Sequence, residues 1–353
     1  MGKGVFNRFQ FVTNSQQGSK IALLLPSLQC KIGFMKMGNL YVAELISKLS
    51  GGSYPWSSPM EFFESPEYLG ARLYPAQRLL LKIWNLQTDF TPWERKKLEE
   101  WTHPGLQGDE DYKSGLQGDV LDRIEFLKEK GHEWFPLVVA VMGRRAGKTF
   151  LTGLQLSYCV ACFLFTQNWG QGADLGHGYE LIVMATTEQQ ARTKLFADFY
   201  SATLRNRFFT PYLVRALPSK IEFATIHDQL RSEAIAKRRR KKVTRGFVSL
   251  TAEAVSSNTA GGRGGAVPFF AFDEGFFALA GESSRSGNAA IQAYTPAMAQ
   301  FFPHQMAIFP SSPRNRSGML YHYYQQGLNT KKSGEWDPEI LVCQLESWKM
   351  YEQ

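Results

Sequence analysis

The fold is decided by one stretch of sequence, Leu137-Val138-Val139-Ala140-Val141-Met142-Gly143-Arg144-Arg145-Ala146-Gly147-Lys148-Thr149. Its first six residues are an unbroken apolar run, which is typical of a parallel strand buried on both faces. A short glycine-containing loop follows, and a stretch compatible with a helix begins at Phe150. A strand, a glycine loop and a helix in this order predict a phosphate-binding loop, or P-loop.

The residue types of this loop suit ATP bound with Mg²⁺. Backbone amides of the loop and of the helix N-terminus cradle phosphate oxygens in such sites. Lys148 is expected to reach the β and γ phosphates, and the Thr149 hydroxyl to ligate Mg²⁺. The loop therefore supplies most of the predicted ATP-binding residues, namely Gly143, Arg144, Arg145, Ala146, Gly147, Lys148 and Thr149.

The loop departs from the usual P-loop pattern at one position. That pattern has a first glycine five residues ahead of Gly147, where this chain has Met142 and carries Gly143 one place later. A Gly-Lys-Thr turn formed by chance would leave the strand before it and the helix after it unexplained.

A second apolar run, Phe269-Phe270-Ala271-Phe272, ends in the carboxylates Asp273 and Glu274. Parallel strands present their carboxyl ends to the ligand in open α/β sheets, so Asp273 is expected beside the P-loop. Asp273 is the candidate to hold Mg²⁺ through its water shell, and Glu274 to orient or deprotonate the water that attacks the γ-phosphate. Such a strand with its acidic end is a Walker B motif.

Other segments alternate between strand and helix patterns, which predicts an α/β fold: a doubly wound, mainly parallel sheet flanked by helices, of the RecA/ASCE-like P-loop NTPase type. Pro75 and a capping box at Thr91-Pro92-Trp93-Glu94 begin helices ahead of the P-loop, which predicts an N-terminal helical extension. Thr187 and Gln190 begin a helix with Ala191, Leu195 and Phe199 on one face. Further strands are predicted at residues 180–185, 246–250, 267–272 and 306–309.

Composition limits the class of protein. The 353 residues carry a net charge of +8 with a pI near 9.2, which favours a polyanionic partner such as nucleic acid. The four cysteines show no metal-ligand spacing, and no apolar run reaches the ~20 residues that span a bilayer. No secretory signal pattern is present near Met1, so we expect a cytosolic protein without a membrane segment.

Four motifs resemble those of the large terminase subunits of tailed bacteriophages. They are an aromatic-Pro-x-Gln element at Tyr74-Pro75-Ala76-Gln77, the arginine-bearing P-loop, the Walker B motif, and a later hydroxyl-rich element at Pro310-Ser311-Ser312-Pro313. The resemblance covers roughly residues 72–314. It implies that Gln77 contacts adenine and that Ser311 and Ser312 couple loss of the γ-phosphate to motion.

The resemblance also implies roles for arginines. Arg144 and Arg145, with Lys148 and Glu274, form the predicted catalytic set, and one guanidinium stabilises charge on the γ-phosphate from the same subunit or contacts a neighbour. Arg263, in the glycine-rich segment before Walker B, is a candidate for phosphate sensing, with a plain flexible loop as the alternative. The dense basic run predicts DNA contact or a solvated loop, and comprises Lys237, Arg238, Arg239, Arg240, Lys241 and Lys242.

Terminase large subunits usually continue into a nuclease domain. The expected organisation is an extension of unknown role at residues 1–60, a P-loop ATPase domain at 61–330, and the start of a linker at 331–353. Nuclease activity is not expected from this chain, either because the ATPase domain is truncated or because the nuclease is a separate chain.

The sequence therefore predicts an ATP-hydrolysing motor that packages a viral genome. It would use ATP and Mg²⁺ to move double-stranded DNA through a portal protein into a procapsid, as a homo-oligomeric ring, with the small terminase subunit as partner, in the cytoplasm of an infected bacterium. Two alternatives stay open: a P-loop helicase or translocase of another type, and a non-catalytic nucleic-acid-binding scaffold with a vestigial P-loop.

Overall fold

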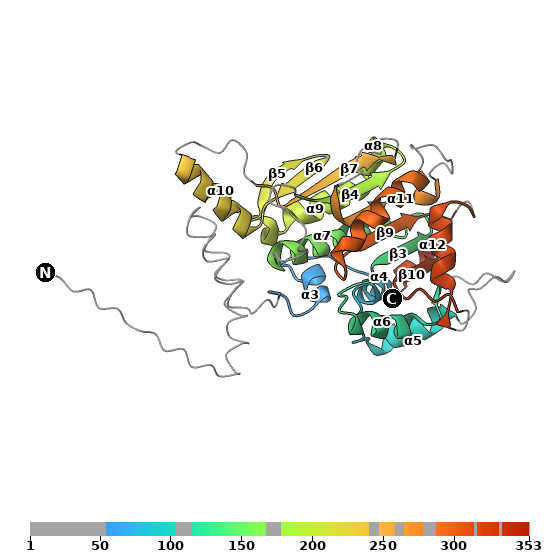
Figure 1. The fold of residues 1–353 in the computed structure, drawn as a ribbon. Coiled ribbons are helices and arrows are strands. Elements are labelled where there is room, and N and C mark those ends of the chain that lie inside the picture. The colour runs from blue at the N-terminus through green and yellow to red at the C-terminus, as the bar shows by residue number, and fades with distance from the viewer. Residues whose placement is uncertain are drawn as a thin grey trace, which may run out of the picture. The chain divides into compact units, whose positions relative to one another are not determined.

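The structure is a computed structural model that describes residues 54–103, 115–166, 178–239, 247–257, 265–277, 287–313, 316–331 and 334–352. The helices and strands named below all lie in the unit Trp56–Gln353. Among the described residues, ten strands form one sheet in the order β1-β2-β10-β3-β9-β8-β4-β7-β6-β5 (Figure 1).

Six neighbouring parallel strands form the centre of this sheet. In spatial order they are β10 (Ile340–Leu345), β3 (Leu137–Met142), β9 (Met306–Ser311), β8 (Ala266–Phe272), β4 (Tyr179–Ala185) and β7 (Leu250–Ser256). Because all six run in the same direction, their carboxyl ends meet at one edge of the sheet. On one side of this centre, β2 (Gly115–Gln117) pairs antiparallel with β10, and β1 (Thr102–His103) pairs parallel with β2. On the other side, β6 (Lys220–Phe223) pairs antiparallel with β7 and with β5 (Leu213–Leu217).

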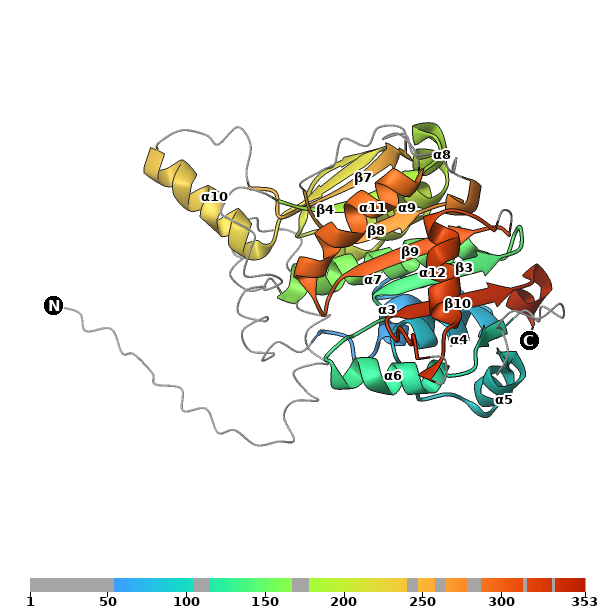
Figure 2. The same cartoon turned by 45° about the vertical axis from the view of Figure 1, so that its right-hand side comes forward.

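Helices cover both faces of the sheet. α7 (Lys148–Thr166) and α9 (Leu195–Arg205) lie on one face, and α11 (Gly287–Met298) and α12 (Met319–Leu328) lie on the other (Figure 2). The second face includes a buried cluster in which Phe270 of β8 stacks on Tyr294 of α11 and packs against Phe309 of β9. β3 is apolar and buried at all six of its residues, because helices cover both faces of the sheet there. The predicted doubly wound, mainly parallel α/β fold is confirmed.

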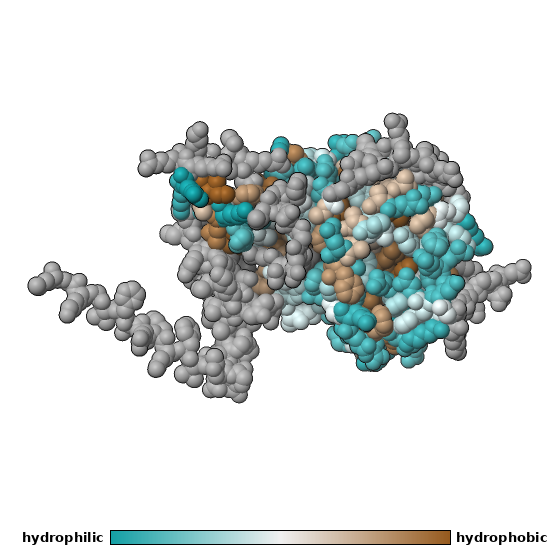
Figure 3. Space-filling view, viewed as in Figure 1, coloured by the Kyte–Doolittle hydropathy of each residue, from teal (hydrophilic) through white to brown (hydrophobic). Residues whose placement is uncertain are grey.

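Helices also precede the P-loop, as predicted. They are α3 (Pro59–Glu64), α4 (Pro75–Trp84), α5 (Pro92–Trp101) and α6 (Val120–Glu129). The capping box at α5 is formed: the Thr91 hydroxyl accepts from the Glu94 amide at 3.2 Å, and the Glu94 carboxylate accepts from the Thr91 amide at 2.7 Å. The outward surface of α5 and α6 is mostly hydrophilic (Figure 3).

α7 passes the length and hydropathy criteria for a membrane span. Its most apolar 18-residue window, however, is 83% buried inside the protein. The helix packs against α9 and the sheet, so its apolar character is explained by its place in the core.

The predicted boundary at residue 330 is wrong. Residues 331–353 were expected to begin a linker, but β10 pairs with the P-loop strand β3 in parallel along its whole length, from Ile340 beside Leu137 to Leu345 beside Met142. A short 3₁₀ helix, η6 (Ser347–Tyr351), follows. The signal was an apolar run at residues 340–343 of the same kind as in the other central strands.

Two other predicted elements differ from the structure. The strand expected at residues 246–250 begins only at Leu250, where pairing with β4 starts. The single helix expected from Thr187 onward is broken at Lys194, whose backbone angles are φ −113° and ψ −98°, into α8 (Glu188–Thr193) and α9. No glycine or proline marks this break in the sequence.

The close packing of α12 on β10 provides a test of the corrected boundary. A Cβ atom at Gly327 would lie 2.5 Å from Val342 Cγ2 and 2.7 Å from Ile340 Cγ2. Gly327→Ala is therefore expected to destabilise the protein by about 1–3 kcal/mol, despite the better helix propensity of alanine. Urea denaturation measures this, with Gln325→Ala on the exposed side of α12 as the control. A stabilised Gly327→Ala protein would contradict the packing.

Candidate functional site

The P-loop connects the buried strand β3 to the N-terminus of α7. Gly147 has φ +76° and Arg145 has φ +65°, both in the left-handed region, and α7 begins at Lys148. A residue other than glycine is strained in that region. The loop therefore turns sharply enough to direct the first amides of α7 at a common point, as phosphate binding requires.

The unusual glycine position has a structural explanation. Met142 is fully buried as the last residue of β3, and its backbone needs no glycine. A Cβ atom at Gly143 would lie 2.2 Å from Ser347 Oγ, so the glycine is required one position later than usual. The departure from the usual pattern thus follows from the close approach of η6.

Gln77 lies beside the P-loop. Its carbonyl accepts from the Tyr74 amide at 3.2 Å, and its Nε2 lies 2.9 Å from where a Cβ of Gly147 would be. The side chain is 4% exposed. The structure therefore brings the aromatic-Pro-x-Gln element and the P-loop together, as the motif resemblance implies.

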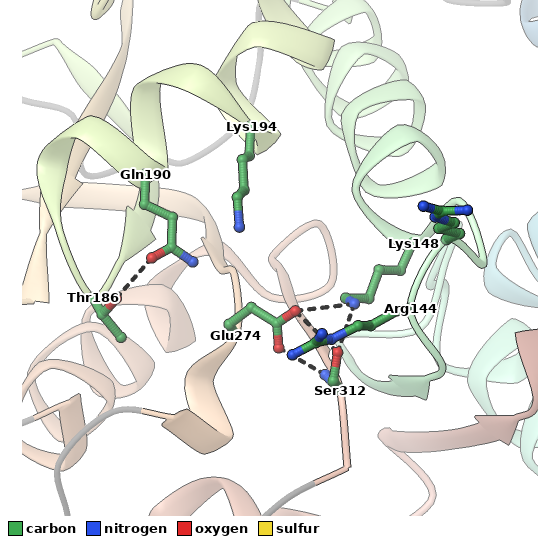
Figure 4. A pocket seen from close by; sticks show the side chains of 8 residues that line it. Arg144, Lys148, Thr186, Gln190, Lys194, Glu274 and Ser312 are labelled. Carbon is green, nitrogen blue, oxygen red and sulfur yellow. Dashed lines mark hydrogen bonds and ion pairs between the residues drawn. The ribbon is translucent and has the colours of Figure 1, made fainter.

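Lys148, Glu274 and Ser312 form one network at the carboxyl edge of the sheet (Figure 4). Lys148 Nζ lies 3.0 Å from Glu274 Oε1 and donates to Ser312 Oγ at 3.0 Å. The Ser312 amide donates to Glu274 Oε2 at 2.8 Å, and its hydroxyl to Glu274 Oε1 at 3.1 Å. Three motifs that are far apart in the sequence are thus joined by direct contacts.

Glu274 is held in a fixed position. Its φ is +55°, and its amide donates to the Pro310 carbonyl of β9 at 2.8 Å. Burial raises the pKa of Glu274, but hydrogen bonds from the Ser312 amide and Lys148, with the charge of Lys148, bring the net pKa below its ordinary value. Glu274 is therefore ionised at neutral pH and aimed at the cavity.

Asp273 differs from its neighbour. It is 1% exposed, and neither carboxylate oxygen has a hydrogen-bond partner among the described residues. Burial first, and the charge of Glu274 second, raise the pKa of Asp273 to about 6, against the opposing charges of Lys148 and Lys194. Burial of carboxylate oxygens without hydrogen-bond partners is energetically unfavourable, and a hydrated cation bound to them would offset this. Asp273 thus fits Mg²⁺.

The other predicted metal ligand has a partner that sequence reasoning missed. The Thr149 hydroxyl interacts with Asp198 of α9, and this interaction partly offsets the effect of burial, which raises the pKa of the Asp198 carboxyl. α9 comes this close because Gly153 of α7 has no side chain: a Cβ there would lie 2.9 Å from the Phe199 amide nitrogen. Asp198 could not be found from motif spacing, because its place depends on helix packing.

A cavity of about 520 Å³ opens in front of the network. Three of its lining residues are Thr186, which directly follows β4, Gln190 of α8, and Lys194 at the α8–α9 junction. Sequence reasoning predicts none of the three as a site residue. Arginine and lysine outnumber carboxylates in the lining, which favours an anionic ligand. The lining consists of Arg144, Arg145, Lys148, Thr186, Gln190, Lys194, Glu274 and Ser312.

η6 contacts the P-loop through residues that do not line this cavity. Ser347 Oγ donates to the Arg144 carbonyl at 2.6 Å, and the Tyr351 hydroxyl donates to the Arg145 carbonyl. The Tyr351 ring packs edge to face on Tyr74, with ring centroids 5.0 Å apart. We call Ser347 and Tyr351 the loop clasp. Sequence reasoning does not identify the loop clasp, because it predicts a linker at residues 331–353.

The remaining predicted residues are only partly described. Ser311 donates to Glu274 Oε2 at 3.4 Å and accepts from the Phe276 amide at 3.3 Å, so it belongs to the network. Arg263, Arg240, Lys241 and Lys242 lie outside the described residues. Lys237 and Arg238 are exposed near the end of α10 (Ile226–Arg239), a helix that extends away from the sheet (Figures 1 and 2); Arg239 is its last residue.

Comparison with known proteins gives weak similarities. No protein-family model matches the chain, and no curated protein matches it. Among solved structures, a mutant ATPase domain of the Thermus phage P74-26 large terminase is 14% identical with a TM-score of 0.41, covering 61% of this chain and 78% of that domain. The HK97 bacteriophage large terminase is 13% identical with a TM-score of 0.38, covering 77% of this chain and 44% of that protein.

Both of these proteins are phage large terminases. The chain spans less than half the length of the HK97 protein, and similarities of this size carry no conclusion about activity or partners. The fold itself is that of a P-loop NTPase, with β9 between the P-loop strand β3 and the Walker B strand β8. The functional proposal below therefore depends on the geometry of the site.

Removal of the clasp hydroxyls is expected to weaken nucleotide binding. Tyr351→Phe and Ser347→Ala each delete one hydrogen bond to a P-loop carbonyl, which leaves the strained loop less well held. Each is expected to lower ATP affinity by roughly 3–10-fold. Titration with a fluorescent ATP analogue measures this, with Tyr200→Phe on α9 as the control. Unchanged affinity in both variants would show that the clasp does not support the loop.

Asp273 predicts a pH-dependent stability. Because its pKa rises from 3.8 to about 6 on folding, the folded state binds more protons than the unfolded state between these values, and stability falls as the pH rises through 6. Asp273→Asn removes the free-energy cost of burying an ionised carboxylate. It is expected to stabilise the metal-free protein by up to roughly 3 kcal/mol at pH 8 and little at pH 4. Urea denaturation in EDTA at both pH values, with exposed Asp122→Asn as the control, checks this. An equal effect at both pH values would contradict it.

Proposed function

We propose that this protein is the ATP-hydrolysing motor of a viral genome-packaging machine. The observation that carries the ATPase part is the network of Lys148, Glu274 and Ser312, with contacts of about 3 Å between residues from three adjacent parallel strands or their loops. A cationic cavity of nucleotide-binding size opens in front of it.

The triphosphate of ATP would replace Glu274 as the partner of Lys148. In the structure the Lys148 ammonium is bound by Glu274 and Ser312. A phosphate oxygen on the P-loop would attract this ammonium and release the carboxylate from it. Binding of ATP would thereby free Glu274 for its role in hydrolysis.

Thr149 and Asp273 would hold Mg²⁺. The orphaned oxygens of Asp273 and the hydroxyl of Thr149 are the oxygen ligands that Mg²⁺ prefers, directly or through water. When bound, the ion neutralises charge on the β and γ phosphates. Asp198 would accept a hydrogen bond from the Thr149 hydroxyl and so orient the hydroxyl's lone pairs toward the metal.

Glu274 would position the attacking water. Its lowered pKa makes it a weak base while Lys148 is its partner, and removal of Lys148 toward the phosphates lets its proton affinity rise. Its backbone is fixed by Pro310 and its carboxylate by the Ser312 amide. Orientation of the water, with charge stabilisation by Arg144 or Arg145, is the main contribution that the site would make.

Ser311 and Ser312 would couple phosphate release to motion. Both contact Glu274, and Ser311 also accepts from the amide of Phe276 in η3 (Gly275–Phe277), which follows the Walker B strand. A change in the partners of Glu274 therefore reaches the end of β9 and η3 together. These segments lead toward α11 and α12, which cover one face of the sheet.

The packaging part of the proposal is supported by the motif resemblance and by the positive net charge. We propose double-stranded DNA as the polymer, a portal protein and a small terminase subunit as partners, a homo-oligomeric ring as the active state, and the cytoplasm of an infected bacterium as the location. The exposed Lys237 and Arg238 at the end of α10 would bind DNA phosphates without base specificity. Arg263 stays a proposed phosphate sensor, and we propose no nuclease role for this chain.

Steady-state ATPase assays test the proposed function. Glu274→Ala is expected to lower kcat by at least about 100-fold while ATP binding is kept, because the residue would act on water and not on the ground-state nucleotide. Assays with and without double-stranded DNA should cover protein concentrations across assembly, with exposed Glu129→Ala as the control. Turnover per subunit should rise on assembly, since a neighbour would complete the site. A wild-type protein without turnover under any condition would favour the scaffold alternative.

A further inference from the structure

Lys194 occupies the wall of the cavity that faces the P-loop. It is the residue at which the helical segment after β4 breaks into α8 and α9, and its side chain extends into the cavity (Figure 4). Within the part of the chain that the structure describes, no hydrogen bond or ion pair occupies its ammonium. An uncommitted cation in a polar cavity is available to a ligand.

Gln190 adds hydrogen-bond donors to the same wall. Its Oε1 accepts from Thr186 Oγ1 at 2.8 Å, which fixes the orientation of the amide and directs its Nε2 into the cavity (Figure 4). The wall therefore presents an ammonium and an amide NH₂ group, both of which donate and neither of which accepts. Such a pair selects an anion with several oxygens.

The charge balance of the cavity also calls for an anion. Lys148 forms an ion pair with Glu274. Arg144, Arg145 and Lys194 remain as cationic groups of the lining without a carboxylate of their own in it. The P-loop explains the first two arginines, because they belong to the loop that binds phosphates. Lys194 comes from a different part of the sheet and needs a separate explanation.

The position of Lys194 indicates which phosphate it would meet. In the proposed function, a nucleotide at the P-loop would direct its terminal phosphate toward Glu274, which positions the attacking water. β4, which leads to Lys194, lies on the side of β8 away from β9 and β3. Lys194 is near enough to act electrostatically on Asp273. The Lys194 wall thus lies across the carboxylate pair from the P-loop, at the terminal-phosphate end.

We propose that Lys194, assisted by the Gln190 amide, binds the γ-phosphate of ATP and so makes the site distinguish ATP from ADP. The inference rests on the proposed ATPase function and adds a binding residue to it. On loss of the γ-phosphate, Lys194 would lose its ligand, and the α8–α9 junction would lose its link to the P-loop.

Binding measurements on the full chain test the assignment. Dissociation constants for a non-hydrolysable ATP analogue and for ADP, both with Mg²⁺, are measured by calorimetry for wild type, Lys194→Met and Lys194→Arg. Lys194→Met is expected to weaken the ATP analogue by about 10–100-fold and ADP by less than about 3-fold, and Lys194→Arg to restore most of the difference. Gln190→Leu is expected to have a smaller effect in the same direction. Arg192→Met, an exposed charge on α8, should change neither constant.

The outcomes separate this inference from the proposed function. If wild type prefers the ATP analogue and Lys194→Met keeps that preference, or weakens both nucleotides equally, the assignment of Lys194 fails while the ATPase proposal stands. If wild type binds neither nucleotide, both fail. Thermal unfolding of each variant shows that the fold is kept, which is expected because the Lys194 side chain is exposed to the cavity.

Discussion

The Lys148–Glu274 ion pair connects two strands that are not neighbours. Lys148 follows β3 and Glu274 follows β8, with β9 between them, and Ser312 at the end of β9 bridges the two. This geometry exists only because the three strands run in parallel, so that their carboxyl ends meet at one edge. The buried apolar sheet beneath fixes this edge, and the contacts of about 3 Å depend on that rigidity.

The site combines two electrostatic features of opposite sign. Among the described residues Asp273 is a buried carboxylate whose oxygens have no hydrogen-bond partner, which favours a cation, and the cavity lining carries an excess of arginine and lysine, which favours an anion. Either ligand alone would match one feature and leave the other. A metal-bound polyphosphate matches both, which is a physical reason to favour Mg²⁺ with ATP over a simple anion.

Sequence could predict what depends on local order along the chain. The strand, loop and helix around Lys148, the acidic end of the Walker B strand and the hydroxyls after β9 have fixed spacings, and the structure brings them together. Tertiary packing placed the rest. Asp198 reaches Thr149 through the contact of α9 with Gly153, and the clasp reaches the P-loop through β10, which no motif marks.

The loop clasp and the Lys194 side of the cavity bind different kinds of group. The clasp, Ser347 and Tyr351, binds carbonyls of Arg144 and Arg145, and carbonyl groups do not bind phosphate. Its hydrogen bonds therefore do not involve the nucleotide directly. The cavity wall formed by Lys194 and Gln190 presents donor groups, the Lys194 ammonium and the Gln190 Nε2, that have no hydrogen-bond partner among the described residues. Loss of the terminal phosphate would thus remove a direct partner on the β4–α8–α9 side and none on the β10 side. Since a ligand shifts an equilibrium only through contacts that differ between two states, motion driven by hydrolysis should involve the α8–α9 junction as well as the segments that Ser311 and Ser312 contact.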